Sequence, residues 1–156
     1  MLAGLIGGYR SSIAYHVAML NLPESIAKRI GLFGLAVLFP GMGALHFAST
    51  DSFIATMPAY LPLHLELVYL SGMFEIAFGI GVLVPRLRRH AGYGLVLLLI
   101  AVFPANVNMA LHPDQFLADG VSAAALYGRL PFQLLLIYWA IWATRPDPVE
   151  SLDRMC

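Results

Sequence analysis

Four long apolar stretches run through the chain, and short segments between them hold most of the charged residues. A helix needs about 20 apolar residues to cross a hydrocarbon layer about 30 Å thick. Helices are also the economical structure in lipid, because every backbone polar group there must be paired within the protein. The pattern therefore predicts four membrane-spanning helices, at about residues 30–48, 64–84, 91–111 and 122–144.

Composition agrees with this hydrophobic pattern. Of the 156 residues, 60% are apolar and 12% are charged, whereas a soluble domain has about 25% charged residues. The formal net charge is zero, which gives no reason to expect a nucleic-acid partner. The single cysteine, Cys156, is the last residue, so disulfide exchange within the chain is excluded. We expect one all-α domain over residues 1–156, an integral membrane four-helix bundle in contact with lipid.

The basic residues predict the direction of the helices. Eight of the nine Lys and Arg residues lie on one side of the predicted membrane, and Arg129, near the outer end of the fourth span, is the exception. Those eight precede the first span, separate the second and third, or follow the fourth: Arg10, Lys28, Arg29, Arg86, Arg88, Arg89, Arg145 and Arg154. Loops rich in Lys and Arg stay in the cytoplasm, so both termini are predicted to be cytoplasmic in a multi-pass membrane protein.

The segment before the first span has a weaker pattern. Tyr9, Ile13, Val17 and Leu20 recur at a spacing of three to four residues. This spacing predicts a short helix lying in the cytoplasmic interface, with a frayed tail as the alternative.

The polar residues of the predicted spans gather in their outer halves or at the centre. Glu75 lies eleven residues after His64, about 16 Å along the helix and near the membrane midplane. At about 100° per residue, Glu66 and Glu75 point to opposite faces, and the deeper Glu75 is assigned to the bundle interior. Glu75 is therefore the candidate catalytic residue, because an ionisable group within a membrane is costly and is a functional-site hypothesis by default.

Two prolines within spans suggest how a pocket forms around Glu75. Pro40 and Pro104 remove backbone donors and kink their helices, and Gly41 and Gly43 would add room. We expect a polar pocket open to the outer face, with Glu75 at its floor. The candidate ligand-binding residues are His46, Ser71, Asn106, Asn108, Arg129 and Gln133.

Each of these residues also has a structural interpretation. Asn106 and Asn108 diverge by about 200°, so both are not expected to line one pocket, whereas Arg129 and Gln133 share a face. Buried amides often join membrane helices, and His46 and Arg129 could lie at the headgroup level. The aromatic residues near the span ends are interpreted as an interfacial belt, among them Phe53, Tyr138, Trp139 and Trp142.

Four segments in order resemble the DoxX family of small bacterial membrane proteins. They are LHFASTDSFIATMPAYLP, LVYLSGMFEIAFGIGVLVP, FPANVNMALHP and RLPFQLLLIYWAIWATRP. The resemblance covers about residues 30–146 and implies a four-helix membrane bundle. The family takes its name from a subunit of a thiosulfate:quinone oxidoreductase, which implies a membrane subunit of a quinone-linked or detoxifying redox system. Some related proteins of similar fold use paired cysteines, which this chain lacks.

Three functions remain open at this point. In the first, Glu75 exchanges a proton with a quinone or binds its head group, and the redox centre belongs to an oxidoreductase partner or to the quinone itself. In the second, the chain is a binding protein or an isomerase-type enzyme for a small lipophilic molecule. In the third, it is an assembly subunit without chemistry. No metal site is expected, because the spacing of the histidines matches no ligand motif.

Overall fold

The computed structural model describes residues 22–23, 25–118 and 120–146 of the chain. Every regular element within these ranges is a helix, which confirms the predicted all-α class. The predicted interfacial helix before residue 25 lies almost entirely outside the described residues. The helices are α2 (Ile26–Ala48), α3 (Thr50–Thr56), α4 (His64–Gly81), α5 (Arg88–Leu111), α6 (Pro113–Ala118) and α7 (Ala123–Thr144).

Three of the four long helices, α2, α5 and α7, are long and apolar enough to cross a membrane. Large apolar side chains point outward from all three, including Val37 (74% exposed), Leu97 (68%) and Leu134 (66%). A soluble monomer does not expose so continuous an apolar surface. Helix α4 has 18 residues and carries Glu66 and Glu75, so its composition marks it less clearly as a span.

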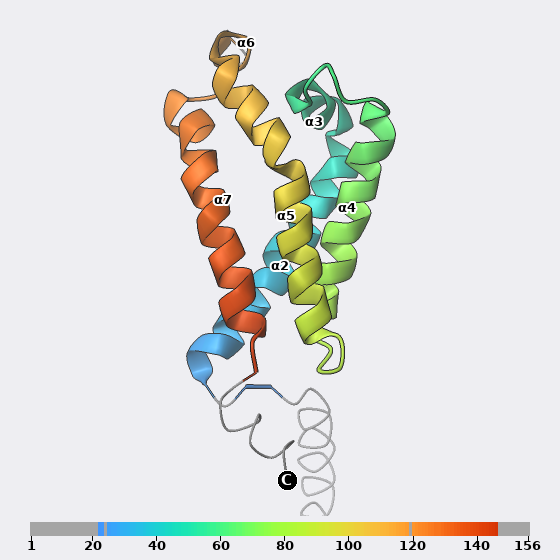
Figure 1. Cartoon of the computed structure of the whole chain (residues 1–156), viewed down its shortest axis with the longest axis vertical. Coiled ribbons are helices and arrows are strands. Elements are labelled where there is room, and N and C mark those ends of the chain that lie inside the picture. Colours follow the sequence, from blue (N-terminus) through green and yellow to red (C-terminus); the bar gives the residue numbers. More distant parts are fainter. Residues whose placement is uncertain (1–21, 24, 119, 147–156) are drawn as a thin grey trace, which may run out of the picture.

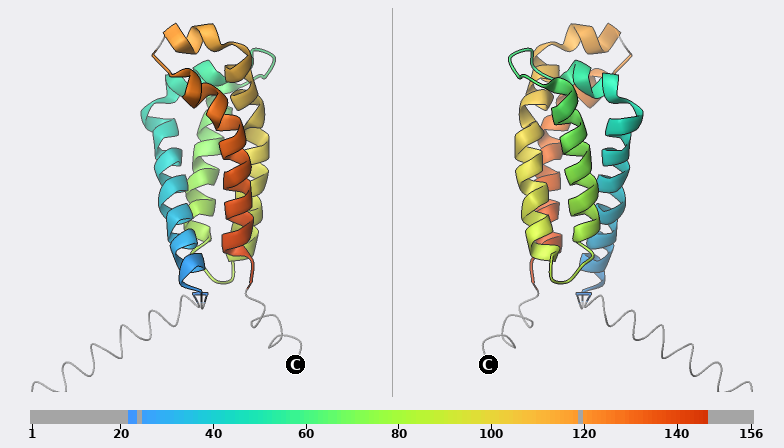
Figure 2. Two further views of the ribbon diagram at one scale, coloured as in Figure 1. Left: turned by 90° about the vertical axis from the view of Figure 1, so that its left-hand side faces the viewer. Right: turned by 90° about the vertical axis from the view of Figure 1, so that its right-hand side faces the viewer.

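The long helices lie side by side, and the short helices α3 and α6 lie at one end of them (Figures 1 and 2). Helix α2 contacts α4 and α7, and α5 contacts the same two helices. The turn between α4 and α5 is as long as the sequence predicts but lies three residues earlier in the chain. The second span was expected to reach residue 84, but α4 ends at Gly81, shortly before Pro85, and a residue that precedes proline disfavours helical backbone angles.

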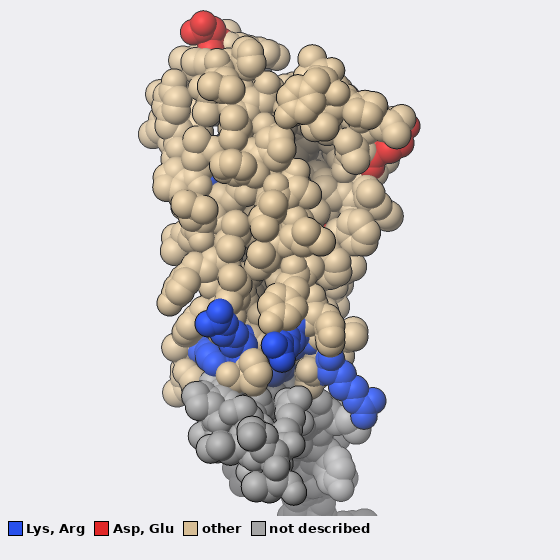
Figure 3. Space-filling view, in the orientation of Figure 1, with Lys and Arg blue, Asp and Glu red and all other residues tan. Residues whose placement is uncertain are grey.

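Charge is divided between the two ends of the molecule (Figure 3). Lys and Arg residues lie at one end and acidic residues at the other, and among the described residues Arg129, in the second turn of α7, is the basic residue outside the basic end. The basic end is defined here by Lys28, Arg29, Arg86, Arg88, Arg89 and Arg145, and the acidic end by Asp51, Glu66 and Asp114.

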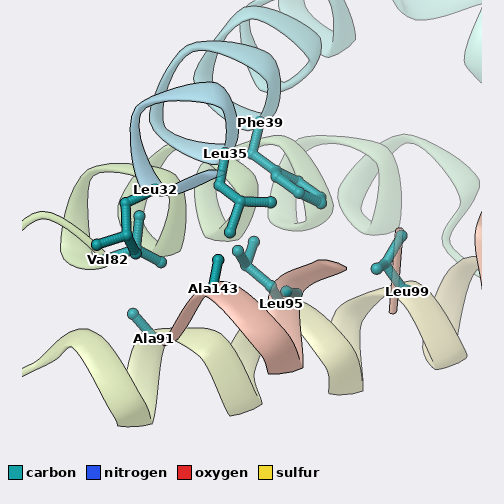
Figure 4. Packing of buried hydrophobic residues seen from close by; sticks show 9 residues of the cluster. Leu32, Leu35, Phe39, Val82, Ala91, Leu95, Leu99 and Ala143 are labelled. Atoms are coloured by element: carbon teal, nitrogen blue, oxygen red, sulfur yellow. The ribbon is translucent and has the colours of Figure 1, made fainter. Parts of the chain in front are cut away.

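The main apolar core lies in the half of the molecule nearer the basic end, and Figure 4 shows how its side chains pack together. Leu32, Leu35 and Leu95 are fully buried there, and the side chain of Arg88 closes this half by donating to the Val82 carbonyl at 3.1 Å. The remaining core residues are Phe39, Val82, Ala91, Leu99, Ala140 and Ala143. Of the buried polar side chains, Arg88 and Thr144 lie in this half, whereas His46, Glu75 and Gln133 lie at the centre or in the other half.

Two tryptophans interpreted as belt residues pack between helices instead. Trp139 and Trp142 are half-buried against the core, and their rings cover Gly31 and Gly34 of α2 so closely that a methyl group on either glycine would collide with them. Tyr138 is 65% exposed and fits the belt interpretation. The sequence did not predict this packing, because the glycines that the tryptophans contact lie on α2, which is far from α7 along the chain.

Candidate functional site

Glycines bring α2 and α4 into backbone contact in the half nearer the acidic end. A Cβ atom on Gly43 would lie 2.6 Å from the Gly72 carbonyl oxygen, and one on Gly72 would lie 2.9 Å from the Gly43 carbonyl oxygen. The expectation that Gly43 adds room is therefore wrong, because it forms the contact between the helices. Gly41 faces outward, with nothing within 4 Å of its added Cβ, so it does not widen a pocket either.

His46 and Glu75 meet beside this glycine contact. His46 Nδ1 lies 3.4 Å from Glu75 Oε2, and the two residues are only 7% and 9% exposed. Helix α2 ends at Ala48, so its last turn lies level with Glu75, eleven residues inside α4. His46 and Glu75 therefore lie at the same level along the bundle, and the interpretation of His46 as a headgroup-level residue stays a prediction. As the rotation along α4 predicted, Glu66 is exposed and Glu75 is buried.

The hydrogen bonds of this pair leave one oxygen without a partner. His46 Nδ1 lies 2.9 Å from the Met42 carbonyl oxygen, which can only accept a hydrogen bond, so Nδ1 carries the hydrogen and donates to it. Glu75 Oε2 has no hydrogen-bond partner among the described residues. Buried side-chain polar atoms are nearly always paired, and an exception needs a physical reason.

Helix α3 covers the imidazole from the acidic end. The Phe53 ring stacks on His46 with the centroids 3.8 Å apart and the planes inclined by 24°. Thr50 Oγ1 donates to the His46 carbonyl at 2.8 Å and so ties the start of α3 to the end of α2. Phe53 is one of the residues interpreted as an interfacial belt, and nothing in its spacing indicates that the chain folds back over His46.

A second polar cluster joins α5 to α7. Asn106 Nδ2 donates to Gln133 Oε1 at 2.7 Å, and Gln133 Nε2 donates to the Leu99 carbonyl at 2.5 Å. Gln133 is 3% exposed. The bonded carbonyl is adjacent to that of Ile100, which Pro104 deprives of its usual helical donor. These amides act on each other and on the backbone, as helix-joining amides do.

The other predicted ligand-binding residues have separate local partners. Ser71 Oγ donates to the Val68 carbonyl of its own helix at 2.9 Å, and Asn108 Nδ2 donates to the Thr56 carbonyl at 3.1 Å. Arg129 Nη1 lies 3.7 Å from Met109 Sδ. In the described part of the chain, no hydrogen bond or ion pair joins Ser71, Asn106, Asn108, Arg129 or Gln133 to the His46–Glu75 pair. The described part of the chain also contains no group of three His, Cys, Asp or Glu side chains that could hold a metal ion.

Fold and site together define a class: an all-helical protein with membrane-length helices and a buried acid–imidazole pair. The chain belongs to the family described as "Domain of unknown function (DUF8561)", whose model matches residues 35–144. The match includes His46, Phe53 and Glu75 and the second polar cluster. No curated protein and no solved structure gives a match to the chain.

Proposed function

We propose that the chain is a four-helix membrane bundle of a bacterial inner membrane, with α4 as the fourth span and both termini in the cytoplasm. The contacts among the four long helices support this arrangement. The division of charge supports the orientation, because Lys and Arg are retained on the cytoplasmic side. The basic end is then cytoplasmic, and α3, α6 and the His46–Glu75 pair belong to the outer half.

Single cysteines on either side of α4 test this arrangement. Asp51→Cys and Leu87→Cys, each made in a Cys156→Ser background, place a thiol at an exposed position before or after the helix. In spheroplasts, a membrane-impermeant thiol reagent should label Asp51→Cys and should reach Leu87→Cys only after lysis. Labelling of both from the outside would show that α4 does not cross, and the reverse pattern would overturn the orientation.

Within this bundle, we propose that the His46–Glu75 pair binds the head group of a quinone, and that the protein is the membrane subunit of a quinone-linked redox system. The observation that carries the proposal is the buried Glu75 Oε2 without a hydrogen-bond partner. An unpaired buried polar group costs about 1–3 kcal/mol, and a ligand group that bonds to it would remove that cost. The resemblance to the DoxX family supports the quinone and an oxidoreductase partner that holds the redox centre.

The neighbouring side chains suit a lipophilic ligand. Ligand sites are mainly apolar, with a few polar groups that fix the orientation. Here the polar groups are Glu75 and His46. Phe53 stacks on His46, and Ile76 lies beside the glycine contact. An isoprenoid tail could lie against the exposed apolar helix faces while the head group reaches the carboxyl group.

One alternative uses the same pair differently. A carboxyl group 3.4 Å from an imidazole is also a suitable arrangement for moving a proton within a bound lipophilic substrate, as an isomerase would. An isomerase would act alone, whereas the redox subunit requires a partner. Activity of the purified protein on a lipophilic substrate without any electron acceptor would favour the isomerase.

Ligand retention tests the proposed function. Wild type, Glu75→Leu and the exposed control Glu66→Leu would be purified gently from native membranes and compared by native mass spectrometry. We expect a quinone-sized lipophile in wild type and Glu66→Leu, reduced about tenfold in Glu75→Leu, because the loss of one hydrogen bond accounts for such a factor. Equal retention by all three proteins would exclude a role of Glu75 in binding.

A further inference from the structure

We propose that the head group bound at the His46–Glu75 pair presents a hydroxyl group, so that the site binds the reduced hydroquinone more tightly than the quinone. This inference rests on the proposed function and adds the redox form that the site selects. It follows from which atoms of the site still need a donor and which need an acceptor.

The imidazole establishes that Glu75 Oε2 is an acceptor. His46 Nδ1 donates to the Met42 carbonyl at 2.9 Å, so its lone pair is unavailable to an incoming proton. Oε2 lies 3.4 Å from the same nitrogen. A hydroxyl hydrogen on Oε2 would face an N–H group and find no acceptor there. The favourable arrangement therefore has a lone pair of Oε2 beside the N–H group, and this oxygen still lacks a well-aligned donor.

The donors of the surrounding side chains are already used elsewhere. The hydroxyl groups of Thr50 and Ser71 donate to backbone carbonyls, as does the amide of Asn108. The second polar cluster uses its donors between α5 and α7. The donor to Oε2 must therefore come from outside this set, and a hydroquinone supplies an O–H group where a quinone offers only a carbonyl oxygen.

The aromatic ring that stacks on His46 favours an aromatic head group. His46 and Phe53 form a stacked aromatic pair, and aromatic rings pack well beside other rings. The glycine contact closes the side between α2 and α4, because Gly43 and Gly72 leave no room even for a methyl group. An aromatic hydroxyl compound fits these neighbours better than a branched aliphatic alcohol.

The test compares one ligand in two redox forms. A decyl-tailed benzohydroquinone and the matching benzoquinone would be titrated into wild-type protein in nanodiscs, under argon, with empty nanodiscs subtracted. We expect the hydroquinone to bind about tenfold more tightly, as one additional hydrogen bond allows. Such a preference would raise the midpoint potential of the bound two-electron couple by about 30 mV.

Three variants keep the test independent of folding. Glu75→Leu should abolish the preference together with binding, and Glu66→Gln should leave both unchanged. Glu75→Gln retains the size of the side chain but brings an amide donor. With its oxygen in the place of Oε2, beside the His46 N–H group, this side chain still offers an acceptor to the hydroquinone hydroxyl, so the preference should persist.

The outcomes separate this inference from the proposed function. Equal binding of both forms, or tighter binding of the quinone, with binding still lost in Glu75→Leu, would overturn the redox preference and leave the quinone site intact. Absence of binding by either form would overturn both proposals. A preference that persists unchanged in Glu75→Leu would show that another group selects the hydroxyl.

Discussion

Replacing Gly43 by alanine is expected to destabilise the folded protein by about 2–3 kcal/mol, because inserted atoms in a tight contact cost up to this much. The new Cβ would lie 2.6 Å from the Gly72 carbonyl oxygen and 3.1 Å from Glu75 Cβ. A backbone carbonyl cannot rotate away as a flexible side chain can, so α2 and α4 would have to separate. Reversible unfolding in mixed micelles, followed by tryptophan fluorescence, would measure the loss.

Gly41 supplies the matched control, two residues away on the same helix. Nothing lies within 4 Å of its added Cβ, and alanine is favoured over glycine in a helix by about 1 kcal/mol. Gly41→Ala should therefore leave stability unchanged or raise it slightly. Equal effects of the two substitutions would show that α2 and α4 do not meet at Gly43.

Replacing Gln133 by leucine is expected to cost about 1–3 kcal/mol, the penalty for buried polar groups that lose their partners. The substitution would leave the Asn106 amide and the Leu99 carbonyl without the bonds that Gln133 makes at 2.7 and 2.5 Å. With Gln133 only 3% exposed, water does not readily replace them. The same unfolding measurement would give the loss.

A double-mutant cycle separates the amide pair from the backbone bond. Asn106→Leu alone removes only the bond between the two side chains, so it should cost less than Gln133→Leu. The double variant should be less destabilised than the sum of the single variants, by about 0.5–1.5 kcal/mol, because the pair acts as a unit. Simple additivity would contradict the hydrogen bond between Asn106 and Gln133.

The sequence predicted those features of the fold that depend on a single helix. Uncharged apolar windows indicated α2 and α5, and the rotation per residue correctly separated buried Glu75 from exposed Glu66. The positions of His46, Glu75 and Gln133 at the centre or toward the acidic end also followed from their places along the chain, although Arg88 and Thr144 are buried near the basic end. These features need no knowledge of which helices are neighbours.

The features that were missed depend on contacts between distant elements. Glycine in a helix is compatible with added room or with close packing, and only the position of α4 shows that Gly43 serves packing. Phe53 was assigned to the membrane interface because its helix could not be placed over His46. The predicted ligand-binding set also mixed two groups: His46 meets Glu75, whereas Asn106 and Gln133 meet each other.

The central claim is that a lipophilic ligand bonds to the buried carboxyl group of Glu75. Infrared difference spectroscopy observes this group directly. Spectra of wild type and Glu75→Leu in nanodiscs would be recorded before and after addition of the decyl-tailed hydroquinone. The account predicts a shifted carboxyl or carboxylate band in wild type that is absent from Glu75→Leu and present in Glu66→Leu. An unchanged spectrum in wild type, or the same shift in Glu75→Leu, would contradict it.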